Sequence, residues 1–219
     1  MTHHRRRNNG TDPSKINETV ELSPAQRYAA FKQTQAKQRT VAAEFARSMP
    51  FELDEFQMQA NDALEAGDNV LVAAPTGAGK TVAADFAIYL AQTRNVKAFY
   101  TTPIKALSNQ KYHDLVDQYG TDKVGLLTGD TSINSEADIV VMTTEVLRNM
   151  LYEHSVTLEA LRYVILDEVH YLADRFRGPV WEEVIIHLPK NVNIIGLSAT
   201  VSNVEDFSEW IESVRGKTT

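Results

Sequence analysis

The chain has 219 residues, no cysteine, 43% hydrophobic and 23% charged residues, and a net charge of -7 at pH 7. These values predict a soluble single domain without disulfides or thiolate metal sites, compatible with a reducing cytoplasm, and no apolar run approaches the ~18 residues of a membrane span. The acidic balance argues against a protein that coats nucleic acid by charge alone, although it allows a groove that contacts a strand through backbone amides and a few side chains.

The N-terminal part of the chain differs from the rest. Residues 1–20 are polar and charged and nearly free of large apolar groups, which predicts a disordered tail that is not a secretory signal. Ser23-Pro24 is typical of an N-cap followed by the first position of a helix. Sparse apolar residues from Ala25 to Met49 predict one long helix or two short ones, ended by Pro50. We therefore expect a helical extension over residues 21–50.

From Asn69 onward, short apolar runs alternate with segments of helical length. Several runs are apolar throughout, as strands buried on both faces of a sheet should be. The alternation predicts an α/β fold with a mostly parallel sheet and helices on both faces, and such sheets bind ligands beyond the carboxyl ends of their strands. We expect strands at Val70–Ala73, Lys97–Tyr100, Val124–Leu127, Ile139–Met142, Tyr163–Leu166 and Asn193–Leu197, and helices at Thr81–Thr93, Ile104–Tyr119 and Thr144–Glu153.

A glycine-rich segment follows the first strand and opens a helix: Ala74-Pro75-Thr76-Gly77-Ala78-Gly79-Lys80-Thr81. Its glycines let backbone amides converge on phosphate oxygens, and the helix N-terminus adds partial positive charge. Lys80 is expected to reach the β- and γ-phosphates and the Thr81 hydroxyl to bind magnesium. The usual first glycine is Ala74 here, and a glycine-rich loop of an unrelated α/β protein is the alternative. The pattern predicts that ATP and Mg2+ bind to the segment from Thr76 to Thr81.

Two carboxylates follow the strand that ends at Leu166, in the sequence Asp167-Glu168-Val169-His170. Asp167 is placed to hold magnesium through its water shell, and Glu168 to polarise the attacking water as general base. With Lys80 these are the candidate catalytic residues, although a solvated acidic turn is the alternative. A lone histidine is more often structural, but within this motif His170 is expected to contact the γ-phosphate or to couple two lobes.

These motifs resemble those of the DExH-box helicases of superfamily 2, and specifically the Ski-like RNA helicases, from about Phe51 to Trp210. In that family the stretch similar to Phe51-Glu52-Leu53-Asp54-Glu55-Phe56-Gln57 recognises adenine. The resemblance implies that Gln57 reads the adenine edge and that Phe51 stacks on the ring. Without it, the same stretch indicates a helix start with core aromatics. Ser198-Ala199-Thr200 resembles the motif that couples hydrolysis to unwinding, through the hydroxyls of Ser198 and Thr200.

Three further segments resemble motifs that track single-stranded nucleic acid. The first, Thr101 to Lys111, places Pro103 and Lys105 at a strand end and helix N-terminus that offer amides to a phosphate. The others are Thr128-Gly129-Asp130 and Thr143 to Arg148. Each segment alone is a loop after a strand or a capped helix, and their order and spacing give them weight. The resemblance implies strand contacts by Pro103, Lys105, Gly129, Asp130, Thr144 and Arg148.

We therefore predict a RecA-like P-loop domain over residues 51–219. Nothing after Ser198-Ala199-Thr200 resembles the motifs of a second RecA-like lobe, which in the family completes the ATP site with arginine fingers, so that lobe is expected as a partner. With it, the resemblance implies ATP hydrolysis coupled to 3′-to-5′ movement along single-stranded RNA. A DNA helicase or translocase lobe remains an alternative, because phosphate contacts do not distinguish RNA from DNA. A non-catalytic nucleotide-binding module is another, against which intact Lys80, Asp167 and Glu168 argue.

Overall fold

The computed structural model describes residues 39–173, 178–199 and 204–219, together with Ser23, Ala25, Gln26, Tyr28, Ala29 and Lys32. The chain divides into two compact units, Met1–Arg39 and Thr40–Thr219. The first unit contains the helix start predicted at Ser23, where the Ser23 N–H donates to Gln26 Oε1 (2.8 Å) and the Gln26 N–H donates to Ser23 Oγ (3.3 Å). These reciprocal bonds form a capping box and confirm the predicted N-cap. The tail predicted at 1–20 lies outside the described residues.

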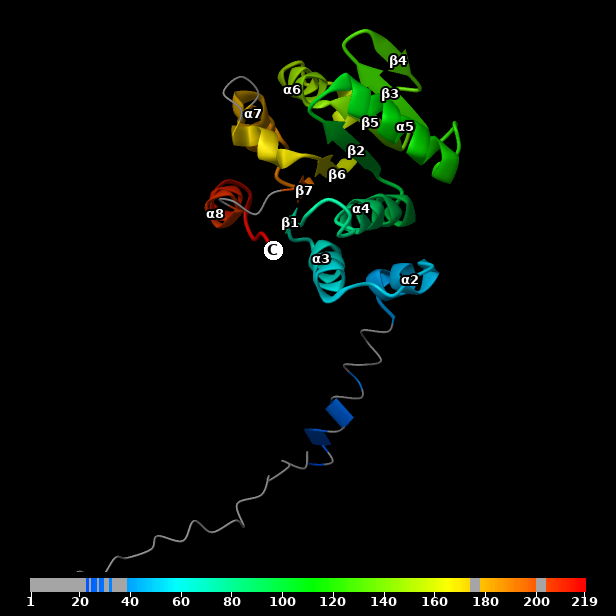
Figure 1. Ribbon diagram of the computed structural model, residues 1–219, viewed down its shortest axis with the longest axis vertical. Coiled ribbons are helices and arrows are strands. Elements are labelled where there is room, and N and C mark those ends of the chain that lie inside the picture. Colours follow the sequence, from blue (N-terminus) through cyan, green and yellow to red (C-terminus); the bar gives the residue numbers. More distant parts are fainter. Residues whose placement is uncertain are drawn as a thin grey trace, which may run out of the picture. The chain divides into compact units, whose positions relative to one another are not determined.

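The second unit is built on a seven-stranded sheet in its described part (Figure 1). The strand order is β1-β7-β6-β2-β5-β3-β4, with β4 antiparallel to β3 and the other neighbours parallel. The predicted α/β fold is confirmed, and β4 is an addition that the sequence did not indicate. The strands are β1 (Val70–Ala73), β2 (Lys97–Thr102), β3 (Val124–Thr128), β4 (Thr131–Ile133), β5 (Ile139–Thr143), β6 (Leu161–Leu166) and β7 (Asn193–Ser198).

Helices cover both faces of this sheet, as the alternating pattern predicts (Figure 1). One face packs against α2 (Val41–Ser48), α3 (Glu55–Ala66), α4 (Thr81–Arg94) and α5 (Lys105–Tyr119). The other packs against α6 (Thr144–Tyr152), α7 (Gly178–His187) and α8 (Val204–Arg215), with short 3-10 turns at Val156–Leu158 (η1) and Val169–Ala173 (η2). Strand β6 shows why two cores form, since Tyr163 and Ile165 enter the first and Val164 and Leu166 the second. Within the described residues, no helix is both long and apolar enough to cross a membrane.

Helix α2 belongs to the same compact unit as the sheet. It begins after Thr40, whose side chain accepts a hydrogen bond from the Ala43 N–H, and it ends just before the predicted stop at Pro50. Its Phe45 ring lies 5.2 Å from the Phe86 ring of α4, centroid to centroid. The carboxylate of Glu65 on α3 accepts hydrogen bonds from two free N–H groups in the first turn of α2. The compact unit that contains the sheet begins at Thr40 and includes α2, while the expected domain boundary before Phe51 stays a prediction.

Two sets of hydrogen bonds hold the C-terminal segment against the rest of the unit. Residues 217–219 run along the outer edge of β1, where the Leu71 N–H donates to the Thr219 carbonyl (2.8 Å). Upstream, the buried guanidinium of Arg215 donates to the carbonyls of Leu188, Pro189 and Val192, which follow α7. Arg215 therefore ties α8 to the turn that joins α7 to β7.

Candidate nucleotide and nucleic-acid site

The carboxyl ends of β1, β7, β6, β2 and β5 lie together at one edge of the sheet (Figure 1). Parallel pairing sets this arrangement, because neighbouring strands that run the same way in register must end side by side. The segments that leave the strands are joined directly across this edge, through Ala74 N–H to the Ser198 carbonyl (3.1 Å), Asp167 N–H to the Thr101 carbonyl (3.0 Å) and Thr144 Oγ1 to the Thr102 carbonyl (3.2 Å). Motifs far apart in the sequence thus share one edge.

The segment between β1 and α4 has the backbone of a phosphate loop. Gly77 and Gly79 have φ angles of 88° and 78°, in the left-handed region that side chains disfavour. Residues alternating between left- and right-handed conformations turn successive N–H groups toward one concave side, which suits an anion. Lys80 occupies the N-cap position of α4, a helix of 14 residues, so the positive end of the helix dipole points at the same place. Thr76, Gly77 and Thr81 are exposed there.

Lys80 is a charged side chain without a counterion among the described residues. It is only 8% exposed, and within the described part of the chain its ammonium group makes no hydrogen bond or ion pair. The Lys80 side chain is therefore mostly buried while its ammonium group, which is not among the buried atoms without a partner, remains available to an anion at the loop. The sequence predicts Lys80 at a phosphate site, and the structure shows an ammonium group without an ion pair among the described residues at that loop.

Gln57 of α3 forms a hydrogen bond with this loop, a contact that the sequence did not predict. Its side chain is 4% exposed. Its Nε2 donates to the Gly79 carbonyl (3.0 Å), while its Oε1 accepts from the Asp54 N–H (2.8 Å). One Nε2 hydrogen and one Oε1 lone pair remain for a base edge. The role of Gln57 in reading adenine therefore stays a prediction, as does stacking by Phe51, whose side chain is 49% exposed.

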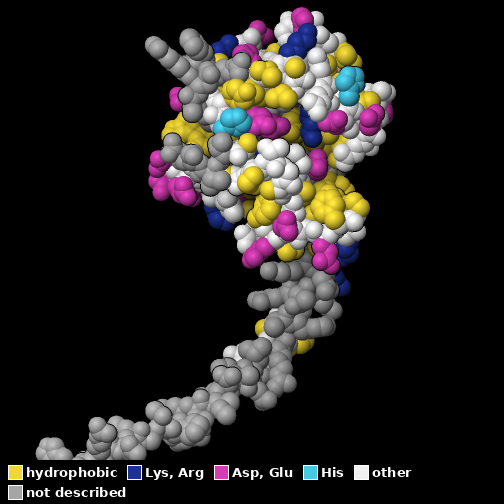
Figure 2. All heavy atoms as spheres, in the orientation of Figure 1, with side chains coloured by type: hydrophobic (Ala, Val, Ile, Leu, Met, Phe, Trp, Pro, Cys, Tyr) yellow, Lys and Arg dark blue, Asp and Glu magenta, His cyan; other side chains and the backbone are white. Residues whose placement is uncertain are grey.

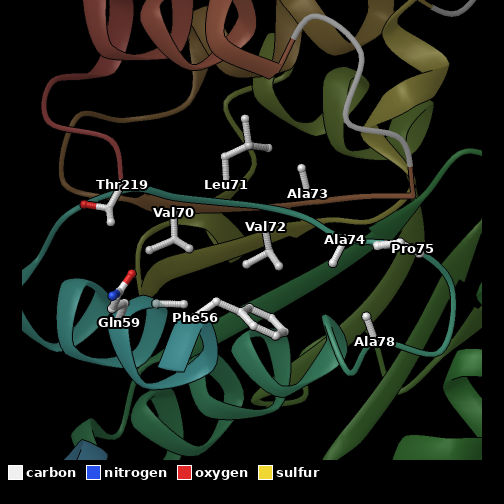
Figure 3. A pocket seen from close by; sticks show the side chains of 11 residues that line it. Phe56, Gln59, Val70, Leu71, Val72, Ala73, Ala74, Pro75, Ala78 and Thr219 are labelled. Atoms are coloured by element: carbon white, nitrogen blue, oxygen red, sulfur yellow. The ribbon is translucent and has the colours of Figure 1, made fainter. Parts of the chain in front are cut away.

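A pocket of ≈ 470 Å³ lies between α3 and the edge strand β1 (Figure 3). Phe56 of α3 faces Val70 and Val72 across it, and Pro75 and Ala78 of the phosphate loop close one end (Figure 3). The described residues that line the pocket are mostly apolar and include no lysine or arginine. It therefore suits an apolar group and does not suit a triphosphate.

Asp167 and Glu168 leave β6 in a tight turn at the same sheet edge. The Glu168 N–H donates to Asp167 Oδ1 (2.9 Å), and Glu168 itself has a left-handed φ of 58°. Its Oε2 lies 3.2 Å from His170 Nδ1. The two atoms are not aligned as a hydrogen bond, and both are buried without another partner in the described residues. A strained backbone and an unpartnered buried carboxylate oxygen are typical of functional sites.

The second oxygen of Asp167 is held by a residue that sequence reasoning missed. The hydroxyl of Tyr100, on β2, donates to Asp167 Oδ2 (2.7 Å). Burial, and then the nearby Asp167 carboxylate, raise the pKa of Tyr100 well above its usual 10.0, so the hydroxyl keeps its proton. A signal was available, because a tyrosine in a strand buried on both faces needs a partner for its hydroxyl. The sequence alone does not say which partner.

The oxygen groups at this edge fit a magnesium ion. Mg2+ prefers carboxylate, hydroxyl and water oxygens, and Asp167 and the exposed Thr81 hydroxyl are groups of that kind. Each Asp167 oxygen receives one hydrogen bond from the protein and retains a lone pair, and Glu168 Oε2 adds negative charge. Of the two coupling candidates, Ser198 is buried at the end of β7, and Thr200 lies outside the described residues.

The candidate strand-binding residues fall into two groups. Lys105 opens α5 and lies 2.5 Å from Asp130, Nζ to Oδ2, beside the exposed Gly129, while Pro103 is buried. On α6, the Thr144 hydroxyl is buried in its bond to Thr102, so the side chain joins β2 to α6. Arg148, one turn later, lies 3.8 Å from Glu183 of α7. On the face shown in Figure 2, the described basic side chains form no continuous band. Strand contacts by these residues remain predictions.

Comparisons with known proteins agree with this geometry. Residues 54–207 match the DEAD/DEAH box helicase family. Over 175 residues, or 80% of the chain, the sequence is 62% identical to Probable helicase HelY of Mycobacterium tuberculosis and covers 19% of it. It is 51% identical over 174 residues to the DExH-box ATP-dependent RNA helicase DExH11 of Arabidopsis thaliana, covering 80% of this chain and 13% of that protein.

Solved structures show the same fold. The helicase Lhr of Mycobacterium smegmatis, bound to single-stranded DNA and AMP-PNP, superposes with a TM-score of 0.66 at 29% identity, covering 82% of this chain and 27% of Lhr. The chain thus spans no more than about a fifth of the curated relatives named above.

Proposed function

The chain belongs to the DEAD/DEAH box helicase family, and from that premise we propose that it is the ATP-binding lobe of an ATP-dependent RNA helicase. In the intact protein, ATP hydrolysis would drive 3′-to-5′ movement along single-stranded RNA in the cytoplasm. The direction and the RNA substrate follow from the resemblance to Ski-like helicases. A second RecA-like lobe would supply the remaining ATP contacts, including arginine fingers.

The observation that carries this proposal is the ammonium group of Lys80, which ends a mostly buried side chain and has no ion pair among the described residues. It lies at the N-terminus of α4, beside two left-handed glycines whose backbone presents amides to an anion. The β- and γ-phosphates of ATP would provide the negative charge that Lys80 lacks among the described residues. A non-catalytic nucleotide-binding module would need the same lysine, but it would not need Glu168 at the same sheet edge.

Hydrolysis requires a magnesium ion, a base and a way to hold the base. Thr81 and Asp167 would hold Mg2+, which on binding neutralises charge that develops on the phosphates. Glu168 would accept a proton from the attacking water at its other carboxylate oxygen, because Oε2 is buried beside His170. His170, whose Nδ1 lies 3.2 Å from Oε2, would keep the carboxylate in place and sense its change of charge.

A titration of the chain with ADP in the presence of Mg2+ tests nucleotide binding. We expect measurable affinity in the wild type and its loss in Lys80→Ala, because that change removes the phosphate-binding cation. Lys123→Ala is the matched control, since Lys123 is an exposed lysine paired with Asp138 at the start of β3, at the opposite edge of the sheet. Equal ADP affinity in Lys80→Ala and wild type would remove Lys80 from the site.

Hydrolysis and strand preference need the longer protein. The chain alone should hydrolyse ATP barely at all, because a missing arginine finger is worth ~10³ or more in rate. Robust RNA-stimulated turnover by this chain would contradict a site shared between lobes. In the longer protein, oligoribonucleotide and oligodeoxyribonucleotide of one sequence should be compared as activators of ATP hydrolysis. Stronger activation by DNA would favour the DNA helicase alternative.

A further inference from the structure

We propose that Tyr100 is a positioning residue, whose hydroxyl holds the Asp167 carboxylate in the orientation in which it binds nucleotide-associated Mg2+. The proposal rests on the proposed function, because it assigns a role toward the magnesium ion of the ATP site. Tyr100 belongs to none of the sequence motifs that predict the site. Its position on β2, beside Asp167, is what gives it this role.

The hydrogen bonds around Asp167 leave its carboxylate no free rotation. The Glu168 N–H holds Oδ1 at 2.9 Å, and the Tyr100 hydroxyl holds Oδ2 at 2.7 Å. The first bond comes from the adjacent residue in the same turn, so by itself it moves with the turn. The second comes from the neighbouring strand, 67 residues away in sequence, and it ties the carboxylate to the body of the sheet. Ligating carboxylates that are themselves hydrogen-bonded bind metals more tightly than free ones.

Tyr100 is itself fixed by its surroundings. Its backbone pairs with β5 on one side and with β6 on the other, opposite Val141 and Ile165. Its side chain is 1% exposed, and Lys111 of α5 places its ammonium group 4.9 Å from the ring centroid. A donor held by two strands and a covering helix can transmit that rigidity to the carboxylate that it contacts.

The Tyr100 hydroxyl could instead serve the fold alone, by giving Asp167 Oδ2 a hydrogen-bond donor. The two roles differ in what removing the hydroxyl changes. If Tyr100 serves the fold alone, Tyr100→Phe lowers stability and leaves magnesium binding unaltered. If it positions Asp167, the same change weakens the binding of Mg2+ and spares the contacts of the nucleotide that do not involve the metal.

The test measures ADP affinity of the chain at a series of MgCl2 concentrations and in EDTA. For Tyr100→Phe we expect the half-saturating Mg2+ concentration to rise ~10- to 100-fold, the range found when such supporting bonds to metal ligands are lost. ADP affinity in EDTA should stay at the wild-type value, because Lys80 and the phosphate loop are intact. Replacing Tyr100 by 4-aminophenylalanine, which keeps a donor at the same place, should restore most of the Mg2+ dependence.

Tyr163→Phe is the matched control. Tyr163 is also a strand tyrosine, 1% exposed, but its hydroxyl accepts a hydrogen bond from Arg94 at 2.5 Å. This variant loses a buried hydroxyl of the same kind, so a Mg2+ dependence equal to that of the wild type shows that the effect at Tyr100 is specific. A similar rise in Tyr163→Phe would overturn the proposal, and so would an unchanged Mg2+ midpoint in a Tyr100→Phe chain that keeps its thermal transition.

Two results separate this proposal from its premise. If wild-type chain binds ADP without any dependence on Mg2+ or Lys80, the proposed function fails and the role of Tyr100 fails with it. If wild type shows both dependences and Tyr100→Phe matches it, only the role of Tyr100 fails. If Tyr100→Phe has no thermal transition and is therefore unfolded, the test uses NMR of the wild-type chain with its tyrosines labelled with 13C at Cζ. Adding Mg2+ to the ADP complex should then shift a tyrosine resonance, and the absence of any shift would refute the proposal.

Discussion

The contact between Gln57 and Gly79 allows the energetics of the phosphate loop to be tested with two glycines. A Cβ atom at Gly79 would lie 2.5 Å from Gln57 Nε2, whereas a Cβ atom at Gly77 would meet nothing within 4 Å. Both residues have left-handed φ angles, 78° and 88°. Alanine at either position therefore suffers the same backbone strain, and only Gly79→Ala also displaces the Gln57 side chain.

The expected magnitudes follow from these two contributions. Left-handed backbone costs alanine about 1–2 kcal/mol, so Gly77→Ala should lose about that much stability. Gly79→Ala should lose the same amount and, in addition, the two hydrogen bonds of Gln57, each worth about 0.5–1.5 kcal/mol net. The sum is about 2–5 kcal/mol. For a chain of this size each kcal/mol corresponds to ~2–4 °C in Tm.

Thermal and urea unfolding of a double-mutant cycle would measure the coupling. In a Gln57→Ala background the amide that obstructs the new methyl group is absent, so Gly79→Ala should cost no more than Gly77→Ala does. ADP affinity, measured on the same variants, should fall for Gly79→Ala in the wild-type background because the loop amides move. An equal cost of Gly79→Ala with and without Gln57 would refute the idea that Gln57 braces the loop.

Three further changes test other parts of the structure. In the longer protein, Glu168→Gln should keep ATP affinity and lower the rate of hydrolysis by ~10²–10⁴. Asp167→Asn should lower that rate and also weaken Mg2+-dependent ATP binding. The reverse pattern in affinity and turnover assays would exchange the roles of the two carboxylates. Arg215→Met should cost about 2–4 kcal/mol in urea unfolding, because the carbonyls between α7 and β7 lose the guanidinium donor, and a change below 1 kcal/mol would contradict this role of Arg215. Burial raises the pKa of Asp85 above its usual 3.8, partly offset by Lys111, so ionised Asp85 destabilises the fold. Asp85→Asn should therefore raise Tm at pH 7, with the gain disappearing as pH falls below 3.8; a gain that persists there would point to another cause.

The residues that we propose to bind phosphate and carry out hydrolysis could be named from the sequence because local patterns specify them. A buried strand, a glycine-rich turn and a helix start lie within the run from Val70 to Thr81, and this order alone places Lys80 at a helix N-terminus. Asp167 and Glu168 follow a strand in the same way. Alternating elements also predict a parallel sheet, whose strand ends must share an edge.

Tertiary structure alone decided which distant residues support that site. Gln57 meets Gly79 across 22 residues, and Tyr100 meets Asp167 across 67. Both contacts depend on packing and strand order, in which β2 lies beside β6 although three strands of the same sheet separate them along the chain. Hydrophobic periodicity shows which face of a strand is buried and does not show its neighbour. The donors that contact Gly79 and Asp167 therefore become visible only when the sheet is assembled.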